Sequence, residues 1–232
     1  MWQGLWQVWA APPGRKRGHG SEGWNVPARL ISLEGGERSG KSTQLALLSA
    51  HLQARGTAFV LTREPGGTPF GERLREVLLA PDLGPVTPFA EMVAFAASRA
   101  EVVARVIRPA LARGDIVIAD RYVGSSRAYQ GYGLGVPLAD IDLVNAAATG
   151  GLVPDLTLLF DVDPAVAAGR APERGHDRIE ARDGGFHARV RAGYLDLAAR
   201  EPARFLVLDG LRSAADIARD VASAVDACIT GR

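Results

Sequence analysis

The chain is poor in cysteine, in long apolar runs and in charge of one sign. Cys228 is the only cysteine among 232 residues, which excludes an internal disulfide and a zinc site built from several cysteines. No apolar run approaches the roughly 18 residues that a membrane-spanning helix needs. The formal net charge is +1, so composition gives no reason to expect a nucleic-acid partner. These absences favour a protein of a reducing, cytoplasmic setting without a membrane partner.

Residues 1–28 differ from the rest of the chain. They read MWQGLWQVWAAPPG followed by RKRGHGSEG, and they keep neither a helical nor a strand period. Their basic residues follow the apolar segment, which reverses the order of a secretory signal. We therefore predict a disordered N-terminal extension. Docking of its tryptophans on a partner or membrane surface, and a start codon assigned too far upstream, are the alternatives.

From residue 29 to residue 232, short apolar runs alternate with longer helix-like stretches, which predicts a single domain of the α/β class. The predicted strands are Arg29–Leu33, Ala58–Thr62, Ile116–Ala119, Leu156–Phe160 and Phe205–Leu208. The predicted helices are Gln44–Arg55, Phe70–Leu79, Phe89–Arg113, Leu138–Ala148, Gly185–Arg200 and Ala214–Cys228. Such alternation indicates a parallel sheet with helices on both faces. Because ligands bind beyond the carboxyl ends of such strands, we expect the first three ends to line one crevice.

The first strand leads into a sequence that matches GxxxxGKS from Gly35 to Ser42. A strand, a glycine-rich loop and a helix in this order form a P-loop, whose backbone N–H groups cradle phosphates. Lys41 would reach the β- and γ-phosphates, and the Ser42 hydroxyl would bind Mg²⁺. The residues predicted to bind the nucleotide are Gly35, Gly36, Glu37, Arg38, Ser39, Gly40, Lys41, Ser42 and Thr43. A chance match in a glycine-rich turn is the alternative.

Arginines accompany two further segments near the predicted crevice. In the first, TREPGGTPFGERLR, Glu64 lies at a strand end and Arg75 on the next helix. A tight turn explains the proline and glycines of this segment but not its arginines. Phe95 and Arg99 are four residues apart and share a helix face. A ring beside a guanidinium can stack on a planar base and bond its edge. Packing of Phe95 in the core is the alternative.

The third strand ends in DRYVGSSRAYQGYG. Asp120, at this strand end, is placed to hold Mg²⁺, usually through water, and Arg121 to enter the same cavity. A structural ion pair between the two is the alternative.

The segment GRAPERGHDRIEARDGG carries four arginines, which are Arg170, Arg174, Arg178 and Arg182. We predict that residues of about 169–184 form a lid that closes over phosphates and excludes water. A solvated charged loop is the alternative.

Four of these blocks, EGGERSGKSTQ, TREPGGTPFGERLR, FAASRAE and DRYVGSSRAYQGYG, resemble the thymidylate kinase family, as do PDLTLLFDVDP and DRIE. The second and fourth blocks are the most specific, because they belong to the acceptor site that separates this family from other nucleoside monophosphate kinases. The resemblance implies that ATP and Mg²⁺ serve transfer of the γ-phosphoryl group to dTMP, giving dTDP for dTTP synthesis in DNA replication. It also implies a P-loop NTPase fold with a five-stranded parallel sheet, and a homodimer.

The resemblance also implies an acceptor site. The residues implied to bind dTMP are Glu37, Glu64, Arg75, Phe95, Arg99, Arg121, Ser126, Tyr129 and Gln130. Arg75 and Arg121 would hold the phosphate, while Phe95 would stack on thymine and Arg99 would bond its edge. Glu37 and Glu64 would lie near the sugar hydroxyl and the metal, and Ser126 and Gln130 would contact the rest of the base or sugar. Tyr129 would fill the space of a 2′-hydroxyl and so favour deoxyribose.

The P-loop departs from the usual bacterial pattern of the family. Similar bacterial sequences commonly have a small residue where this loop has Arg38 and take the catalytic arginine from the lid, whereas eukaryotic-type members carry it in the loop. This chain has both. We predict that Arg38 shares catalysis with a lid arginine, Arg170 or Arg174, beside Lys41 and Arg121.

Two other functions remain open. A related kinase could act on dUMP or dCMP, or on a nucleoside, because discrimination by one methyl group is worth only about 1 to 3 kcal/mol. A nucleotide-dependent switch is the more distant alternative. The sequence has no NKxD guanine-recognition signature, and a switch would leave the acceptor-side arginines unexplained.

Overall fold

A six-stranded sheet forms the centre of the computed structural model, which describes residues 8–9, 29–170 and 176–231. The strands are β1 (Val8–Trp9), β2 (Leu30–Gly35), β3 (Phe59–Arg63), β4 (Ile116–Asp120), β5 (Leu156–Asp161) and β6 (Phe205–Asp209). Their order is β1-β3-β4-β2-β5-β6. Strands β2 to β6 are parallel, so the predicted five-stranded parallel sheet is confirmed.

The edge strand β1 differs from the sequence-based expectation. Val8–Trp9 pair antiparallel with Val60 and Phe59 of β3, where we predicted disorder. The outer edge of β3 offers N–H and C=O groups to an extended segment, and such an edge is a ready template for pairing. The remainder of the predicted extension, residues 1–7 and 10–28, lies outside the described residues. The division of the chain after residue 28 stays a prediction.

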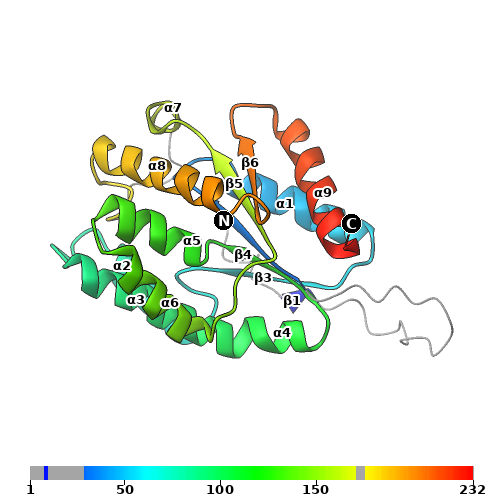
Figure 1. Cartoon of the computed structure of the whole chain (residues 1–232), viewed down its shortest axis with the longest axis horizontal. Coiled ribbons are helices and arrows are strands. Elements are labelled where there is room, and N and C mark those ends of the chain that lie inside the picture. The colour runs from blue at the N-terminus through cyan, green and yellow to red at the C-terminus, as the bar shows by residue number, and fades with distance from the viewer. Residues whose placement is uncertain (1–7, 10–28, 171–175, 232) are drawn as a thin grey trace.

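Helices cover both faces of the sheet (Figure 1). They are α1 (Lys41–Ala54), α2 (Pro69–Leu79), α3 (Pro88–Val102), α4 (Arg108–Ala112), α5 (Val123–Ser126), α6 (Leu138–Thr149), α7 (Pro164–Ala168), α8 (Gly184–Arg200) and α9 (Ala214–Thr230). Two π-helical turns, η1 (Val103–Ile107) and η2 (Arg127–Gly133), continue α3 and α5. None of the described helices is both long enough and apolar enough to cross a bilayer.

Neighbouring residues of each buried strand face opposite layers. Ile31 of β2 packs with Leu48 of α1 and Val221 of α9 in one core. Leu30, its neighbour, packs with Val102 at the end of α3 in the core of the other face. Because successive strand side chains alternate and both faces are covered, the central strands read as continuous apolar runs.

The segment from α5 to η2 was missed by the sequence-based assignment, as was the short helix α7. No helix was predicted for residues 123–133, yet η2 packs along α8. The glycines permit this contact, because a Cβ added at Gly193 of α8 would lie 2.5 Å from the ring of Tyr132. Helix packing thus overrides local propensity here, and π-helical turns of this kind are frequent at functional sites.

Candidate active site

The P-loop connects β2 to α1 and presents its lysine from the first turn of the helix. Gly35 and Gly40 have φ values of 142° and 95°, which residues with a Cβ rarely adopt. Lys41 Nζ donates to the carbonyl oxygens of Gly35 at 3.1 Å and Gly36 at 2.7 Å. Ser42 and Thr43 follow in α1 and are exposed. The strand, loop and helix predicted for a P-loop are therefore all present.

Burial changes the ionisation of the P-loop lysine. Lys41 is only 8% exposed, and burial, with a smaller contribution from Arg121, lowers its pKa to about 8. Because a buried ammonium has lost most of its hydration, its N–H groups bond loop carbonyls in place of water.

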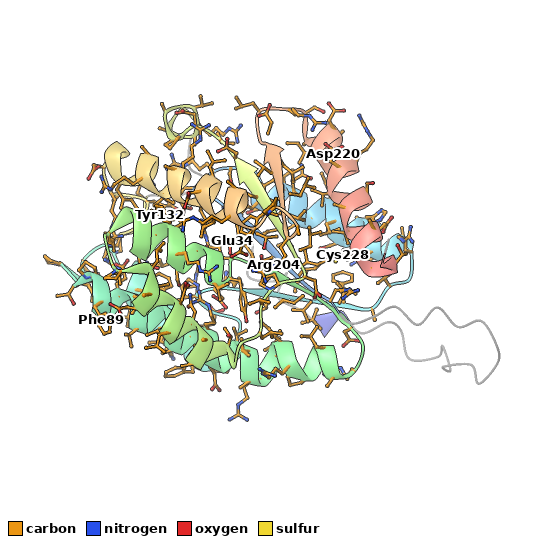
Figure 2. The ribbon with its side chains drawn as sticks, in the orientation of Figure 1. Glu34, Phe89, Tyr132, Arg204, Asp220 and Cys228 are labelled. Carbon is orange, nitrogen blue, oxygen red and sulfur yellow. The ribbon has the colours of Figure 1, made fainter. Side chains whose placement is uncertain are left out.

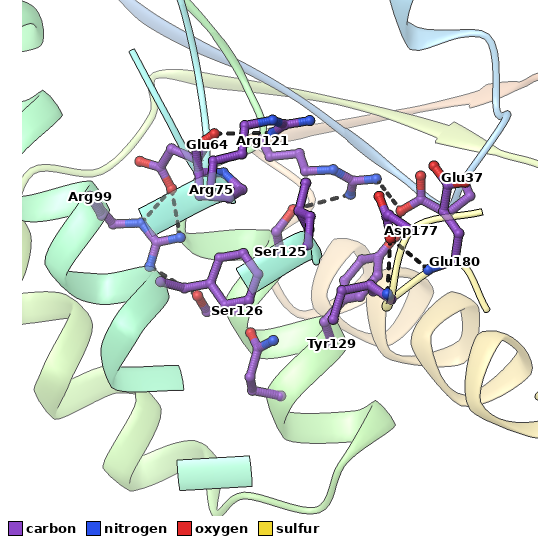
Figure 3. Close-up of a pocket in the computed structure, with 15 residues that line it drawn as sticks. Glu37, Glu64, Arg75, Arg99, Arg121, Ser125, Ser126, Tyr129, Asp177 and Glu180 are labelled. Atoms are coloured by element: carbon purple, nitrogen blue, oxygen red, sulfur yellow. Dashed lines mark hydrogen bonds and ion pairs between the residues drawn. The ribbon is translucent and has the colours of Figure 1, made fainter. Parts of the chain in front are cut away.

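One pocket opens beside the P-loop at the carboxyl ends of β3 and β4 (Figure 3). All the residues implied to bind the acceptor line it: Glu37, Glu64, Arg75, Phe95, Arg99, Arg121, Ser126, Tyr129 and Gln130. It is also lined by residues to which we had given no role: Pro65, Leu79, Ser125, Asp177, Ile179 and Glu180. Four of these belong to the blocks TREPGG and DRIE, so the sequence did carry a signal for them.

Arg121 enters the pocket from the loop after β4. Its guanidinium donates to Glu37 Oε1 at 2.7 Å and to the Gly35 carbonyl oxygen at 3.0 Å, and it lies 5.0 Å from the centre of the Tyr129 ring. The Tyr129 hydroxyl donates to the same oxygen of Glu37 at 2.8 Å. Burial opposes ionisation of Glu37, but Arg121 and Lys41 outweigh it and lower its pKa to about 2. Arg121 thus forms its ion pair with Glu37, and not with Asp120 as the structural alternative would have it.

A buried carboxylate that we had given no role supports this loop. Glu34, at the end of β2 (Figure 2), is fully buried and accepts hydrogen bonds from the Tyr122 backbone N–H at 2.9 Å and from Ser125 Oγ at 2.6 Å. The Tyr194 hydroxyl donates to it at 2.9 Å. Burial raises the pKa of Glu34. These bonds fix the chain directly after Arg121, while the Arg121 backbone N–H donates to the Leu33 carbonyl oxygen at 3.0 Å. Glu34 therefore holds in place the loop that carries the guanidinium.

Arg99 is buried among protein partners. The side chain is 1% exposed, and it donates to Glu64 Oε2 at 2.7 Å, Ser126 Oγ at 2.9 Å, Asn145 Oδ1 at 2.6 Å and the Tyr122 carbonyl oxygen at 3.1 Å. Arg99 Nη2 also pairs with Glu64 Oε2 at 2.6 Å. All five N–H groups of the guanidinium therefore have a partner, and a bond to a base edge requires exchange of one of them. The role of Arg99 at the base stays a prediction.

Glu64 keeps one acceptor atom for a ligand. Burial raises its pKa to about 7 despite the opposing charge of Arg99. Its Oε1 is buried and has no hydrogen-bond partner in the described part of the chain. An unpaired buried oxygen is costly, so a ligand donor in the pocket would relieve that cost.

Phe95 and Arg75 occupy other walls of the pocket. Phe95 is half-buried and lines the pocket, which agrees with a ligand platform better than with the core alternative. Arg75 donates to the Pro65 carbonyl oxygen at 3.0 Å.

The segment predicted to form a lid begins with an arginine that contacts the P-loop backbone. Arg170 donates to the carbonyl oxygens of Arg38 at 2.7 Å and Gly210 at 3.0 Å. The Arg38 guanidinium lies 2.8 Å from His176 Nδ1, at the other end of the segment 171–175 that the structure leaves undescribed. Arg174 lies outside the described residues. Arg38 therefore contacts the predicted lid through both its backbone and its side chain.

The residues predicted to bind Mg²⁺ have a suitable donor chemistry. Asp120 Oδ1 is buried without a hydrogen-bond partner in the described ranges, and Ser42 is exposed at the start of α1. In residues 29–170 and 176–231 no three His, Cys, Asp or Glu side chains form a metal cluster. Mg²⁺ commonly uses one or two protein oxygens together with phosphates and water, so this sparse donor set fits the ion.

Comparison with known proteins identifies the family. The family model for thymidylate kinase matches residues 33–221. The chain belongs to the thymidylate kinase family.

Individual thymidylate kinases resemble the chain over most of its length. The Deinococcus radiodurans enzyme is 52% identical over 197 residues, which cover 84% of this chain and 95% of that protein. The Exiguobacterium sp. enzyme is 52% identical over 185 residues, 79% of this chain and 87% of that protein. The crystal structure of thymidylate kinase from Ehrlichia chaffeensis superposes with a TM-score of 0.69 at 31% identity, covering 85% of this chain and 98% of that one. The chain is therefore an enzyme, a phosphotransferase of the family that phosphorylates dTMP.

The lowered pKa of Lys41 makes nucleotide binding by this thymidylate kinase pH-dependent. The ammonium is charged below pH 8 and neutral above it, so we expect the Kd of Mg·ADP to rise between pH 7 and 9, approaching about tenfold per unit above the pKa of about 8. Isothermal titration calorimetry across this range measures the effect. Lys41→Met should bind more weakly and lack the pH-dependent step. A Kd of the unmodified protein that is flat from pH 7 to 9 would contradict the assignment.

Proposed function

We propose that this thymidylate kinase transfers the γ-phosphoryl group of ATP to dTMP, giving dTDP and ADP for dTTP synthesis in DNA replication. The observation that carries the proposal is the convergence of the implied acceptor residues in one pocket that shares Glu37 with the P-loop. A pocket built in this way brings a bound acceptor phosphate next to the phosphates of a P-loop nucleotide.

The two sides of the pocket suit the two ends of a nucleotide. Figure 3 shows Arg99 and Ser126 on one side, and Glu37 toward the other, with Arg121 reaching across to it. We assign thymine to the side of Arg99 and Phe95, and the phosphate to the side of Arg121. In this orientation the phosphate displaces or joins the Glu37 carboxylate as the partner of Arg121.

Tyr129 has a fixed position between these two sides. Its ring makes edge contacts with Phe186 and Tyr194, at 6.0 and 6.2 Å between ring centres, and its hydroxyl bonds Glu37. Because these contacts restrict the ring, it cannot easily give way to an extra ligand atom. This supports the assignment of Tyr129 as the residue that excludes a 2′-hydroxyl.

The charge of the substrates determines the mechanism. A phosphate monoester with a second pKa of about 6 is largely dianionic at neutral pH, so the acceptor needs no general base. The main barrier is the approach of two polyanions, and cations lower it by neutralising the transferring group. Lys41, Arg121, Arg38 and a lid arginine supply this charge. We propose direct in-line transfer without a phosphoenzyme.

Ser42 and Asp120 are proposed to hold Mg²⁺, which when bound neutralises charge on the donor phosphates. The near-neutral composition and the single cysteine support a cytoplasmic enzyme whose partners are ATP and dTMP, with neither nucleic acid nor membrane among them.

A homodimer is supported by exposed apolar side chains on three helices that pack side by side, α2, α3 and α6. They are Phe70, Val77, Phe89, Val93 and Leu143. Because α3 packs against both α2 and α6, these side chains lie on neighbouring helices, and exposed apolar groups gathered on one part of a surface mark an interaction site. We expect sedimentation equilibrium to give twice the chain mass, and Val93→Asp, on the middle helix, to give the monomer. Val166→Asp, a matched change at an exposed valine of α7, should leave the dimer intact. A monomeric unmodified protein would refute the proposed homodimer.

The acceptor assignment is tested by ADP release with dTMP, dUMP, dCMP, the ribose form of TMP, and thymidine supplied separately. We expect turnover with dTMP to exceed turnover with the others, since Phe95, Tyr129 and the pocket arginines fit a thymine deoxynucleotide. Thymidine should be inert, because it lacks the phosphate that Arg121 binds. Preference for another acceptor would refute the assignment of the acceptor pocket to dTMP and leave the P-loop assignment unaffected. Turnover of ATP without any acceptor would favour the alternative of a nucleotide-dependent switch.

The shared arginine role is tested by comparing kcat in Arg38→Ala, Arg170→Ala and Arg174→Ala. If Arg38 and a lid arginine share stabilisation of the transferring group, Arg38→Ala and one lid variant should each lower kcat by about 10- to 100-fold. Arg219→Ala, at an exposed arginine of α9 paired with Asp216, serves as the control. An unchanged kcat in Arg38→Ala would show that the lid acts alone.

A further inference from the structure

Glu91 is a buried carboxylate that joins the lid to the acceptor pocket. It lies in the first turn of α3, four residues before Phe95, and its side chain is fully buried. Gln130 Nε2 donates to Glu91 Oε1 at 3.0 Å. Arg178 Nη2 and Arg182 Nη2 each donate to Glu91 Oε2 at 2.7 Å. No role in substrate binding or catalysis has been given to this carboxylate above.

The surroundings of Glu91 keep it ionised. Burial alone would raise its pKa, but the N–H groups of Arg182, Gln130 and Arg178 outweigh burial and hold the pKa below its ordinary value. An ionised carboxylate can only accept hydrogen bonds. Each of the three side chains that face it must therefore present a donor.

This requirement fixes the amide of Gln130. Its NH₂ group has to face Glu91, so the amide oxygen is the acceptor that Gln130 can offer to a ligand. Gln130 lines the acceptor pocket and is only 2% exposed, so a flip of the amide would oppose two acceptors in a buried site. Thymine and uracil carry a donor at N3, whereas cytosine carries an acceptor there. The Gln130 amide oxygen, held in place by Glu91, therefore favours binding of thymine and uracil and opposes binding of cytosine.

The same carboxylate docks the second half of the lid. Arg178 also donates to the Leu78 carbonyl oxygen at 2.9 Å, and its backbone N–H bonds the Leu79 carbonyl oxygen at 3.3 Å. Ile179 and Glu180 follow at once and line the pocket. The wall that this segment adds to the pocket therefore depends on the arginines that Glu91 holds.

We propose that Glu91 is the positioning residue of the acceptor pocket, which orients the Gln130 amide and docks residues 178–182 so that the pocket selects a pyrimidine with an N3–H. The inference rests on the proposed function, because the pyrimidine in question is that of dTMP. Glu91 acts through Gln130 and the lid arginines and does not itself touch the substrate.

Glu91→Gln tests the proposal, since it keeps the size of the side chain but can present either a donor or an acceptor to Gln130. We expect the KM for dTMP to rise about tenfold or more, and the ratio of kcat/KM for dTMP over dCMP to fall about tenfold. The KM for ATP should stay within about threefold, because no contact of Glu91 reaches the P-loop. Glu101→Gln, on the same helix and paired with the exposed Arg105, is the matched control and should behave as the unmodified enzyme.

Gln130→Leu distinguishes positioning from general support of the fold. In that background Glu91→Gln should no longer change the dTMP-to-dCMP ratio, because the amide oxygen that distinguishes the bases is gone. Its remaining effect, through the lid arginines, should appear only as a higher KM for both nucleotides. A further fall of the ratio in the double variant would overturn the proposal. If circular dichroism shows Glu91→Gln to be unfolded, Arg182→Met replaces it. The Arg182 side chain is 18% exposed, and the substitution removes the two N–H groups that it donates to the same carboxylate.

The outcomes separate this inference from the proposed function. If the unmodified enzyme phosphorylates dTMP and a folded Glu91→Gln keeps its selectivity, the role of Glu91 is wrong and the proposed function stands. Arg182→Met should weaken selectivity by a smaller factor. If a folded Arg182→Met variant keeps its selectivity, the role of Glu91 is likewise wrong and the proposed function stands. If the unmodified enzyme does not phosphorylate dTMP, both are wrong.

Discussion

A site that brings two polyanions together must keep several cations close to one another before the phosphates arrive. In this thymidylate kinase each cation is held by a fixed acceptor: Arg121 by Glu37, Lys41 by loop carbonyls, and Arg99 by Glu64. Without these partners, buried like charges would destabilise the folded protein. The partners also restrict each side chain to one geometry, and a ligand then replaces or joins an acceptor that is already in place.

Backbone conformation is unusual at the same place. In the described part of the chain, only two residues other than glycine have a positive φ, Arg38 at 55° and Arg121 at 72°. Both are proposed to face the transferring phosphoryl group, and both lie in loops at the ends of central strands. Left-handed backbone at residues with a Cβ costs roughly 1 to 3 kcal/mol each, and it persists where surrounding contacts over-determine it. The bonds of Glu34 to the two residues Tyr122 and Ser125, which follow Arg121, are contacts of this kind.

The lid arginines divide into two groups by what they contact. Arg170 bonds the backbone of the P-loop, and so belongs to the donor side. Arg178 and Arg182 bond Glu91 on α3, and so belong to the acceptor side. The described parts of the predicted lid thus contact both the P-loop and a helix that lines the acceptor pocket. The lid sequence alone shows four arginines, each four residues from the next, and gives no reason to separate them.

The sequence by itself determined the parallel sheet, the P-loop and, through family resemblance, the set of acceptor residues, because runs of apolar residues and short motifs are local signals. Tertiary structure alone decided which charges pair. Glu64 meets Arg99 across 35 positions of the chain, and Glu91 meets Arg182 across 91. Such pairs depend on which strand ends and helix faces become neighbours, and no local pattern encodes that. For the same reason the sequence did not show that every N–H of Arg99 has a protein partner, or that Glu34 and Glu91 orient the residues that face the substrate.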